Sequence, residues 1–301
     1  MKCKICRGDT FTQCGQPRID KRFSAHDFKK YTIVQCCSCG FYFISPDINL
    51  DQNQWSKIYQ DNYFVTTLSR WRIKLQARET KERLDYLESN INEEELTTFL
   101  DMGCGEGFVL KIALEKGWNA YGLDIADNLT HDVARDKINY FCGNLFDAKY
   151  PDDHFDIIYM DSVLEHIDYP MNTLNELLRI LKPGGQFFTI VPNEDCLENM
   201  MKKMAYTFAF KKDLYGIIKP FYSPYHINGF NKKSISKALE LAGFTLKDVK
   251  TFGSSYPFWR GFKRLSQSYF KALLLYPIGL CSTLLNKQVQ LQVLSIKPKV
   301  S

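Results

Sequence analysis

Residues 96–107 read LTTFLDMGCGEG, an apolar run that leads into a turn with three glycines, Gly103, Gly105 and Gly107. The run predicts a buried strand, and the residues that follow, FVLKIALEKGW, predict a helix that ends at Gly117. Glycines between a strand and a helix let the backbone pass close to a ligand at the helix N-terminus. Alone, this G-x-G-x-G pattern fits a dinucleotide, a methyl donor or no ligand.

Strand and helix patterns alternate after this turn. Further strands are predicted in NAYGLDIA, INYFCGN, FDIIYMDS and GGQFFTIVPN, with a helix in MNTLNELLRILK. This order predicts an α/β domain with a largely parallel sheet, whose ligands bind at the carboxyl ends of the strands. Asp124 ends the second strand, 21 residues after Gly103. A carboxylate there can accept hydrogen bonds from both hydroxyls of a ribose, and the alternative is a turn or helix-cap residue.

Two C-x-x-C pairs lie near the N-terminus, Cys3/Cys6 and Cys36/Cys39, with 29 residues between them. Each pair predicts a tight turn with two thiolates facing one metal, and two such turns complete a tetrahedral zinc site. Four thiolates leave no open position, so this zinc would be structural and would let about 45 residues fold without their own core. Unrelated buried cysteines are the alternative. Two other cysteines lack the paired spacing but stay alternative ligands: Cys14 and Cys37.

Composition predicts a globular protein of a reducing compartment. The chain has 301 residues and ten cysteines, and its start, MKCKICRGDT, lacks the apolar segment of a secretory signal. We therefore expect a cytoplasmic location. The longest apolar run, ALLLYPIGL at 272–280, is broken by Pro277 and falls short of the roughly 20 residues that span a bilayer. No transmembrane segment is expected.

Charge is distributed unevenly along the chain. Residues 91–200 carry 7 basic and 21 acidic side chains, whereas residues 201–301 carry 17 basic and 3 acidic ones. The basic residues of this last third alternate with aromatic ones. Three interpretations are open: a solvated surface over an aromatic core, contact with an anionic membrane or lipid-linked substrate, or binding of nucleic acid. The apolar run at 272–280 favours lipid over RNA.

Five segments, in order, resemble class I S-adenosylmethionine-dependent methyltransferases over residues 95–251: FLDMGCGEG, YGLDIA, GNLFDAKYPDDHFDIIYMDSVLEHI, LLRILKPGGQFFTIVPN and HINGFNKKSISKALELAGF. The cysteine pairs, followed by aromatics and a proline, resemble the zinc-ribbon-like leader of some bacterial members, which often lie among polysaccharide and natural-product biosynthesis enzymes. The resemblance implies a Rossmann-like, seven-stranded, mostly parallel sheet with an antiparallel last strand, plus a small N-terminal zinc ribbon. VQLQVLSIKP suits that last strand.

The resemblance also implies how the chain is divided. Residues 1–48 would form the zinc-ribbon-like module, 49–92 a helical linker and 93–301 the methyltransferase domain. Within that domain we expect a lid at 196–230 and a basic, aromatic insertion at 254–286.

For the cofactor S-adenosylmethionine, the resemblance implies binding residues at the strand ends. Asp101 and the glycines would line the methionine end, Asp124 would hold the ribose, and residues after the third strand would contact adenine. The family often has an acidic residue there, whereas this chain has Asn144, whose carboxamide oxygen can still accept from the adenine amino group. The full predicted set is Asp101, Gly103, Gly105, Gly107, Asp124, Asn144, Leu145, Asp161 and Ser162. The last two would lie beside the transferable methyl group.

Methyl transfer from a sulfonium is an in-line displacement, so the enzyme mainly aligns the reactants and excludes water. A base is needed only if the acceptor must lose a proton. His166, in LEHI after the fourth strand, and His226, in SPYHINGF before a later helix, are the candidates. The alternative for His166 is packing at a helix start.

The predicted function is therefore S-adenosylmethionine-dependent methyl transfer to a small or lipid- or sugar-linked acceptor, in polysaccharide, lipid or natural-product biosynthesis. The acceptor would be anionic or lipid-linked, with peripheral contact between the enzyme and an anionic membrane; nucleic acid is less favoured. Two alternatives are an RNA methyltransferase and a non-catalytic zinc-ribbon scaffold that retains a nucleotide-binding fold. These motifs concern binding of the methyl donor, so they do not identify the acceptor or the atom that is methylated.

Overall fold

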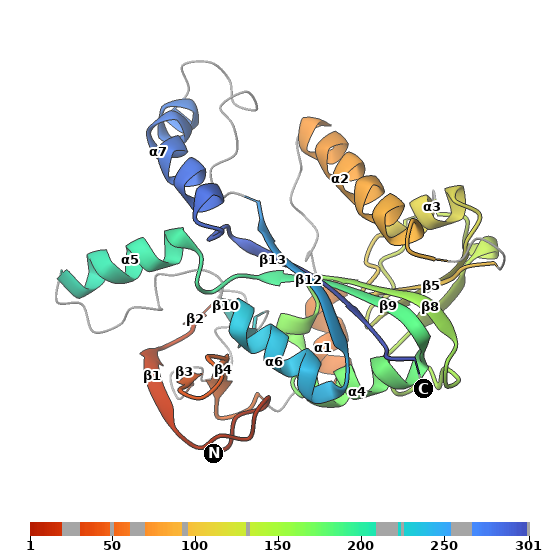
Figure 1. Ribbon diagram of the computed structural model, residues 1–301, viewed down its shortest axis with the longest axis horizontal. Coiled ribbons are helices and arrows are strands. Elements are labelled where there is room, and N and C mark those ends of the chain that lie inside the picture. The colour runs from red at the N-terminus through yellow and green to blue at the C-terminus, as the bar shows by residue number, and fades with distance from the viewer. Residues whose placement is uncertain are drawn as a thin grey trace.

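A computed structural model describes residues 1–19, 31–48, 51–60, 70–91, 96–130, 133–208, 222–223, 226–253 and 267–299. Its centre is a seven-stranded sheet with the strand order β12-β13-β9-β8-β5-β6-β7 (Figure 1). The opening apolar run forms a strand between β6 and β8, and its residues Phe99 and Leu100 are fully buried.

The strand directions confirm the predicted fold class. Five strands run parallel: β5 (Thr98–Met102), β6 (Asn119–Asp124), β7 (Asn139–Cys142), β8 (Phe155–Asp161) and β9 (Leu181–Pro192). The last strand, β13 (Gln290–Ile296), pairs antiparallel with both β9 and β12 (Thr245–Phe252). The sheet is therefore mostly parallel, with an antiparallel last strand as expected.

Helices cover both faces of this sheet. Figure 1 shows α2 (Arg70–Glu88) and α3 (Phe108–Glu115) on one side, and α4 (Pro170–Ile180) and α6 (Lys232–Ala242) on the other. Each side has its own cluster of buried apolar residues. Full burial of one leucine contributes about 1.5–3 kcal/mol, so these clusters fix the helices on the sheet. The most buried leucines of the four helices are Leu84, Leu87, Leu110, Leu174, Leu177 and Leu239.

The cysteine-rich segment forms a second sheet that includes a strand from far along the chain. Its order is β1-β3-β4-β11, formed by β1 (Phe11–Gly15), β3 (Thr32–Cys36), β4 (Tyr42–Ser45) and β11 (Asn228–Gly229). Next to it, β2 (Arg18–Ile19) pairs with β10 (Tyr222–Ser223). The rings of Phe41 and Phe230 lie 5.0 Å apart, so this sheet shares a core with the larger domain.

The other elements fall in the predicted linker, lid and insertion. The linker contains α1 (Gln52–Gln60) as well as α2; α5 (Leu197–Phe208) lies in the lid and α7 (Gln267–Leu284) in the insertion. Two 3₁₀ turns are η3 (Arg135–Lys137) and η4 (Leu164–His166). The basic and aromatic segments 209–221 of the predicted lid and 254–266 of the predicted insertion lie outside the described residues. Among the helices that are described, none has the length and apolarity to cross a membrane.

Asn231 joins the two sheets. Its side-chain oxygen accepts a hydrogen bond from the Ser234 N–H (2.8 Å), and the Ser234 hydroxyl in turn accepts from the Asn231 N–H (2.9 Å), which caps α6. The amide group donates to the Gly40 carbonyl (3.1 Å) and to Asp195 (2.9 Å). Gly40 has φ +77°, and a Cβ there would lie 2.9 Å from the Asn231 amide, so only glycine allows this approach.

We predict that Asn231→Ala lowers the free energy of unfolding by about 2 kcal/mol, because the helix loses its cap and two acceptors lose a donor. Chemical denaturation of both proteins measures this difference. The matched control is Asn139→Ala, which removes an exposed asparagine from the edge of the sheet and should change stability by less than about 0.5 kcal/mol. Equal effects of the two substitutions would contradict the joining role.

Candidate cofactor and acceptor site

A cavity of about 440 Å³ opens at the carboxyl ends of β5, β6, β7 and β8. This is the edge of a parallel sheet at which ligands bind, and the volume is in the range of small-molecule sites. Helix α1 closes one side through Trp55 and Tyr59. The ends of the four strands and the turns that follow them contribute these lining residues: Met102, Gly103, Leu123, Asp124, Ile125, Gly143, Asn144, Leu145, Phe146, Asp161, Ser162 and Val163.

Asp124 organises the glycine turn. One carboxylate oxygen accepts from the Gly105 N–H (2.8 Å) and the other from the Ala126 N–H (3.1 Å). Burial raises the pKa of this carboxyl, while the Gly105 and Ala126 N–H groups oppose that rise. Each oxygen keeps a second lone pair for a ligand hydroxyl.

The three glycines are needed for two different reasons. All have positive φ, at +79° for Gly103, +50° for Gly105 and +81° for Gly107. A Cβ on Gly103 would lie 2.2 Å from the Val163 side chain, and one on Gly107 would lie 2.8 Å from Val133. Gly103 and Gly107 therefore let neighbouring segments pack closely, whereas Gly105 presents its N–H to Asp124.

Of the nine predicted cofactor residues, six line the cavity: Gly103, Asp124, Asn144, Leu145, Asp161 and Ser162. Gly105, Gly107 and Asp101 are not among the lining residues. Asp101 is buried, and its Oδ2 atom has no hydrogen-bond partner within the described residues. Burial, followed by the neighbouring Asp161 and Asp124 carboxylates, raises the pKa of Asp101. An unsatisfied buried carboxyl behind the cavity suits a site that receives a cationic ligand.

Asn144 lies in the cavity wall, but its oxygen is already used. It accepts from the N–H groups of Phe146 (2.9 Å) and Asp147 (3.0 Å), and the amide group donates to the Asp147 carboxylate. This is a local side-chain turn. The predicted contact between Asn144 and adenine stays a prediction.

Asp161 and Ser162 meet at a strained point after β8. Ser162 has φ +58°, which non-glycine residues rarely adopt, and its hydroxyl donates to Asp161 (2.9 Å). Arg83 of α2 lies 3.7 Å from the Asp161 carboxylate and stacks on the Phe252 ring at 4.7 Å. Arg83 is not among the predicted site residues, because the sequence of a helix rich in charged residues does not indicate which arginine faces inward.

The structure brings the two predicted histidines together. Their rings lie edge to face, with centroids 4.7 Å apart. The Ile227 N–H donates to the Glu165 carbonyl (3.0 Å), and the Asn228 amide donates to the Ile167 carbonyl (2.5 Å), which fixes the segment with His226 against η4. His166 lines the cavity, and burial lowers the pKa of His226 to about 4, so His226 is neutral at pH 7.

Three residues near His166 were not predicted. Trp55 and Tyr59 stack at 6.2 Å on α1, and the Tyr59 ring stands edge-on to His166 at 5.8 Å. Glu165 is 1% exposed. Two aromatics four positions apart on a helix were the only signal for this wall of the cavity, and the segment was assigned to a linker.

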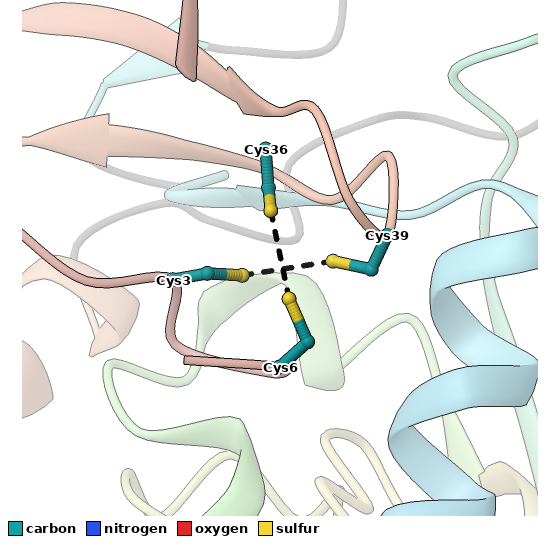
Figure 2. A group of neighbouring side chains, drawn as sticks. All are labelled: Cys3, Cys6, Cys36 and Cys39. Carbon is teal, nitrogen blue, oxygen red and sulfur yellow. Dashed lines mark hydrogen bonds between the residues drawn. The ribbon is translucent and has the colours of Figure 1, made fainter. Parts of the chain in front are cut away.

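The four predicted metal ligands converge on one point (Figure 2). The Sγ atoms of Cys3 and Cys39 are 3.6 Å apart, as are those of Cys6 and Cys36, and all four lie within 4.8 Å of one another. Tetrahedral zinc–thiolate bonds of about 2.3 Å require sulfur separations of about 3.8 Å, so the residues fit this ion. A further cysteine, Cys37, is exposed and its sulfur lies beside Thr12.

Fold and cavity define an α/β protein with a small-molecule site at its sheet edge, built around an acidic residue and a glycine turn. A model of the methyltransferase domain family matches residues 68–249. The chain therefore belongs to this family, and its resemblance to class I S-adenosylmethionine-dependent methyltransferases is confirmed.

Individual proteins agree with this membership. An S-adenosylmethionine-dependent methyltransferase of Mycolicibacterium smegmatis is 28% identical over 152 residues, which are 50% of this chain and 52% of that protein. An uncharacterised protein of Methanocaldococcus jannaschii is 33% identical over 132 residues, 44% of this chain and 52% of that one. The chain spans about half the length of these curated relatives. The [4+2]-cyclase SpnF superposes with a TM-score of 0.54 over 85% of this chain and 100% of its own, at 16% identity, which shows the shared fold.

Proposed function

We propose that this protein transfers a methyl group from S-adenosylmethionine to an acceptor. The observation that carries the proposal is a single cavity whose wall includes Asp124 at one point and Asp161, Ser162 and His166 at another. Donor-binding and acceptor-side groups therefore face the same space, which an in-line displacement requires.

The residues of the cavity fit the cofactor. Asp124 would accept from the ribose hydroxyls, and the unpartnered Asp101 carboxyl behind the glycine turn would favour the cationic methionine end. Asp161 and Ser162 would lie beside the sulfonium, which supplies the methyl group when the cofactor is bound. Leu145 and Asn144 would contact the adenine.

The acceptor would bind beside His166, against the cavity wall that Trp55 and Tyr59 form. If it loses a proton on attack, His166 is the base that reaches the cavity, and His226 orients its ring from behind. We infer a small or lipid- or sugar-linked acceptor, since the cavity wall is mainly apolar and aromatic.

Calorimetry with S-adenosylhomocysteine tests the cofactor assignment. Wild-type protein should bind, and Asp124→Ala should lose most of the affinity, because both the ribose acceptor and the anchor of Gly105 disappear. The matched control is Asp127→Ala, which removes an exposed aspartate that pairs with Arg135 and should leave binding unchanged. An absence of binding by wild type, or full binding by Asp124→Ala, would remove the basis for methyl transfer and favour the scaffold alternative.

We also infer one structural zinc per chain, held by Cys3, Cys6, Cys36 and Cys39, because their sulfur separations match a tetrahedral thiolate site. The ion would join the turn before β1 to the turn between β3 and β4, and so align β4, which pairs with β11.

Metal analysis of protein dialysed against metal-free buffer should find close to one equivalent of zinc. Cys36→Ser should lose the ion and destabilise the N-terminal sheet, since metal binding and folding are coupled. Cys37→Ser should keep it, because this exposed side chain lies beside Thr12 and is not part of the four-cysteine cluster. Loss of zinc in Cys37→Ser would show that the ligand set is wrong.

Peripheral contact with an anionic membrane remains our interpretation of the basic last third, in a protein that acts in the cytoplasm. Helices α5 and α7 pack together and extend beyond the sheet on one side (Figure 1). They expose large apolar side chains: Met200, Met201, Met204 and Phe208 on α5, and Leu273, Leu280 and Leu284 on α7. Exposed apolar side chains in a third of the chain with 17 basic and 3 acidic residues suit an anionic lipid surface.

Co-sedimentation with anionic and neutral vesicles at two salt concentrations tests this contact. Binding to anionic vesicles should weaken as salt rises, since each lysine or arginine near the surface contributes about 1 kcal/mol. Phe208→Ser should lower the salt-resistant part, and so should Trp259→Ala, at a position outside the described residues. Leu96→Ser, which changes an exposed apolar residue just before β5, is the control. Equal recovery in the supernatant under all conditions would favour a merely solvated surface.

A further inference from the structure

Glu165, His166 and His226 form a compact cluster behind the acceptor end of the cavity. One ligand atom of each side chain lies within 4.8 Å of the others, and the His166 Nε2 atom is 4.0 Å from a Glu165 carboxylate oxygen. Two imidazoles and one carboxylate are a ligand set that transition metals use with other positions left open.

The cluster contains buried polar atoms that the described part of the protein does not satisfy. Glu165 is 1% exposed, and neither of its carboxylate oxygens has a hydrogen-bond partner among the described residues. The Nδ1 atom of His226 is buried and equally unpartnered there. A buried carboxylate without a partner is costly, and a bound cation is one of the few groups that offset this cost.

The backbone holds the three ligands in place. Glu165 and His166 lie in the same 3₁₀ turn, and the hydrogen bond from the Ile227 N–H to the Glu165 carbonyl fixes His226 beside them. The backbone already anchors the three residues. Small side-chain rotations that bring the ligand atoms about 1 Å closer to one another would therefore allow bonds of about 2.1 Å to one ion.

We propose that Glu165, His166 and His226 bind a divalent transition-metal ion beside the acceptor end of the cavity. His166 lines the cavity wall, so the open positions of the ion face the space next to Asp161 and Ser162. In this arrangement His166 is a metal ligand and not the base.

The position of the ion identifies an oxygen-bearing acceptor. A hydroxyl bound to a divalent ion has a lower pKa and gives its proton to bulk water. The oxygen lone pair forms the bond to the methyl carbon, and the carbon–sulfur bond breaks with its electron pair on sulfur. This acceptor role rests on the proposed methyl transfer, whereas binding of the ion does not.

Titration with Mn²⁺ on protein that holds one equivalent of zinc, with free zinc removed, tests the site, because the four thiolates retain zinc and do not compete for Mn²⁺. The electron paramagnetic resonance signal measures free Mn²⁺, and its difference from the total Mn²⁺ should correspond to one ion bound per wild-type chain. Glu165→Gln and His226→Gln should each weaken binding by at least about tenfold, since each removes a ligand. The matched control is Glu194→Gln, which alters another fully buried carboxyl that has no hydrogen-bond partner in the described part of the chain and lies outside the cluster; it should bind Mn²⁺ like wild type.

Binding of S-adenosylhomocysteine by the same proteins reports whether each variant is folded. Wild type that binds S-adenosylhomocysteine but no Mn²⁺ would overturn the metal site and leave the proposed function intact. Wild type that binds Mn²⁺ alone would support the site and remove the methyl-transfer role. Unchanged Mn²⁺ binding in a folded Glu165→Gln or His226→Gln variant, or an equal loss in Glu194→Gln, would show that these residues are not the ligands.

Discussion

The backbone of residues 227–231 is the constraint on which the site depends. Its β11 pairs with β4 of the cysteine-rich sheet, and the Ile44 N–H donates to the Ile227 carbonyl (3.0 Å). The same residue donates its own N–H to the Glu165 carbonyl in the turn after β8. One short segment thus links the N-terminal sheet, the acceptor side of the cavity and the cap of α6 at Asn231. A displacement of the cysteine turns would therefore reach His226 through one strand.

The parts of this structure that the sequence predicts well are local. LTTFLDMGCGEG and the strands after it follow from apolar runs that end in glycine or aspartate, and β13 agrees with the strand that the family resemblance implies. The place of Asp124 and Gly103 in the cavity wall follows as well, since both lie at strand ends whose positions the topology fixes. His166 and His226 were both candidates because each lies near a strand or helix end. Their contact depends on the pairing of β11 with β4, across more than 180 residues, and nothing in one sequence specifies that pairing.

The residues that the sequence could not identify share one property: their role depends on which way each side chain faces in the folded protein. Trp55 and Tyr59 lie on a helix that reads as a linker, and Arg83 lies among other charged residues of α2. Glu165 lies in an acidic third of the chain, where the sequence does not distinguish one site carboxylate from the many others. Its position beside His166 and His226 separates it from the other buried acids, and that position is decided by the fold of η4 and of the segment that contains His226. The glycine-turn side of the cavity thus follows from local motifs, whereas the side with His166 depends on contacts between distant segments.

Three buried acids lie in or near this site. Asp101, Glu165 and Glu194 are each at most 3% exposed, and each has at least one carboxyl oxygen without a partner among the described residues. Burial raises the pKa of Glu165 to about 8 and also raises those of the other two, so their ionised forms oppose folding near neutral pH. The buried leucines and phenylalanines of the two helical layers offset that cost. Buried acids that lack hydrogen-bond partners among the described residues favour cationic ligands. A sulfonium cofactor and a divalent ion beside it would be two such ligands.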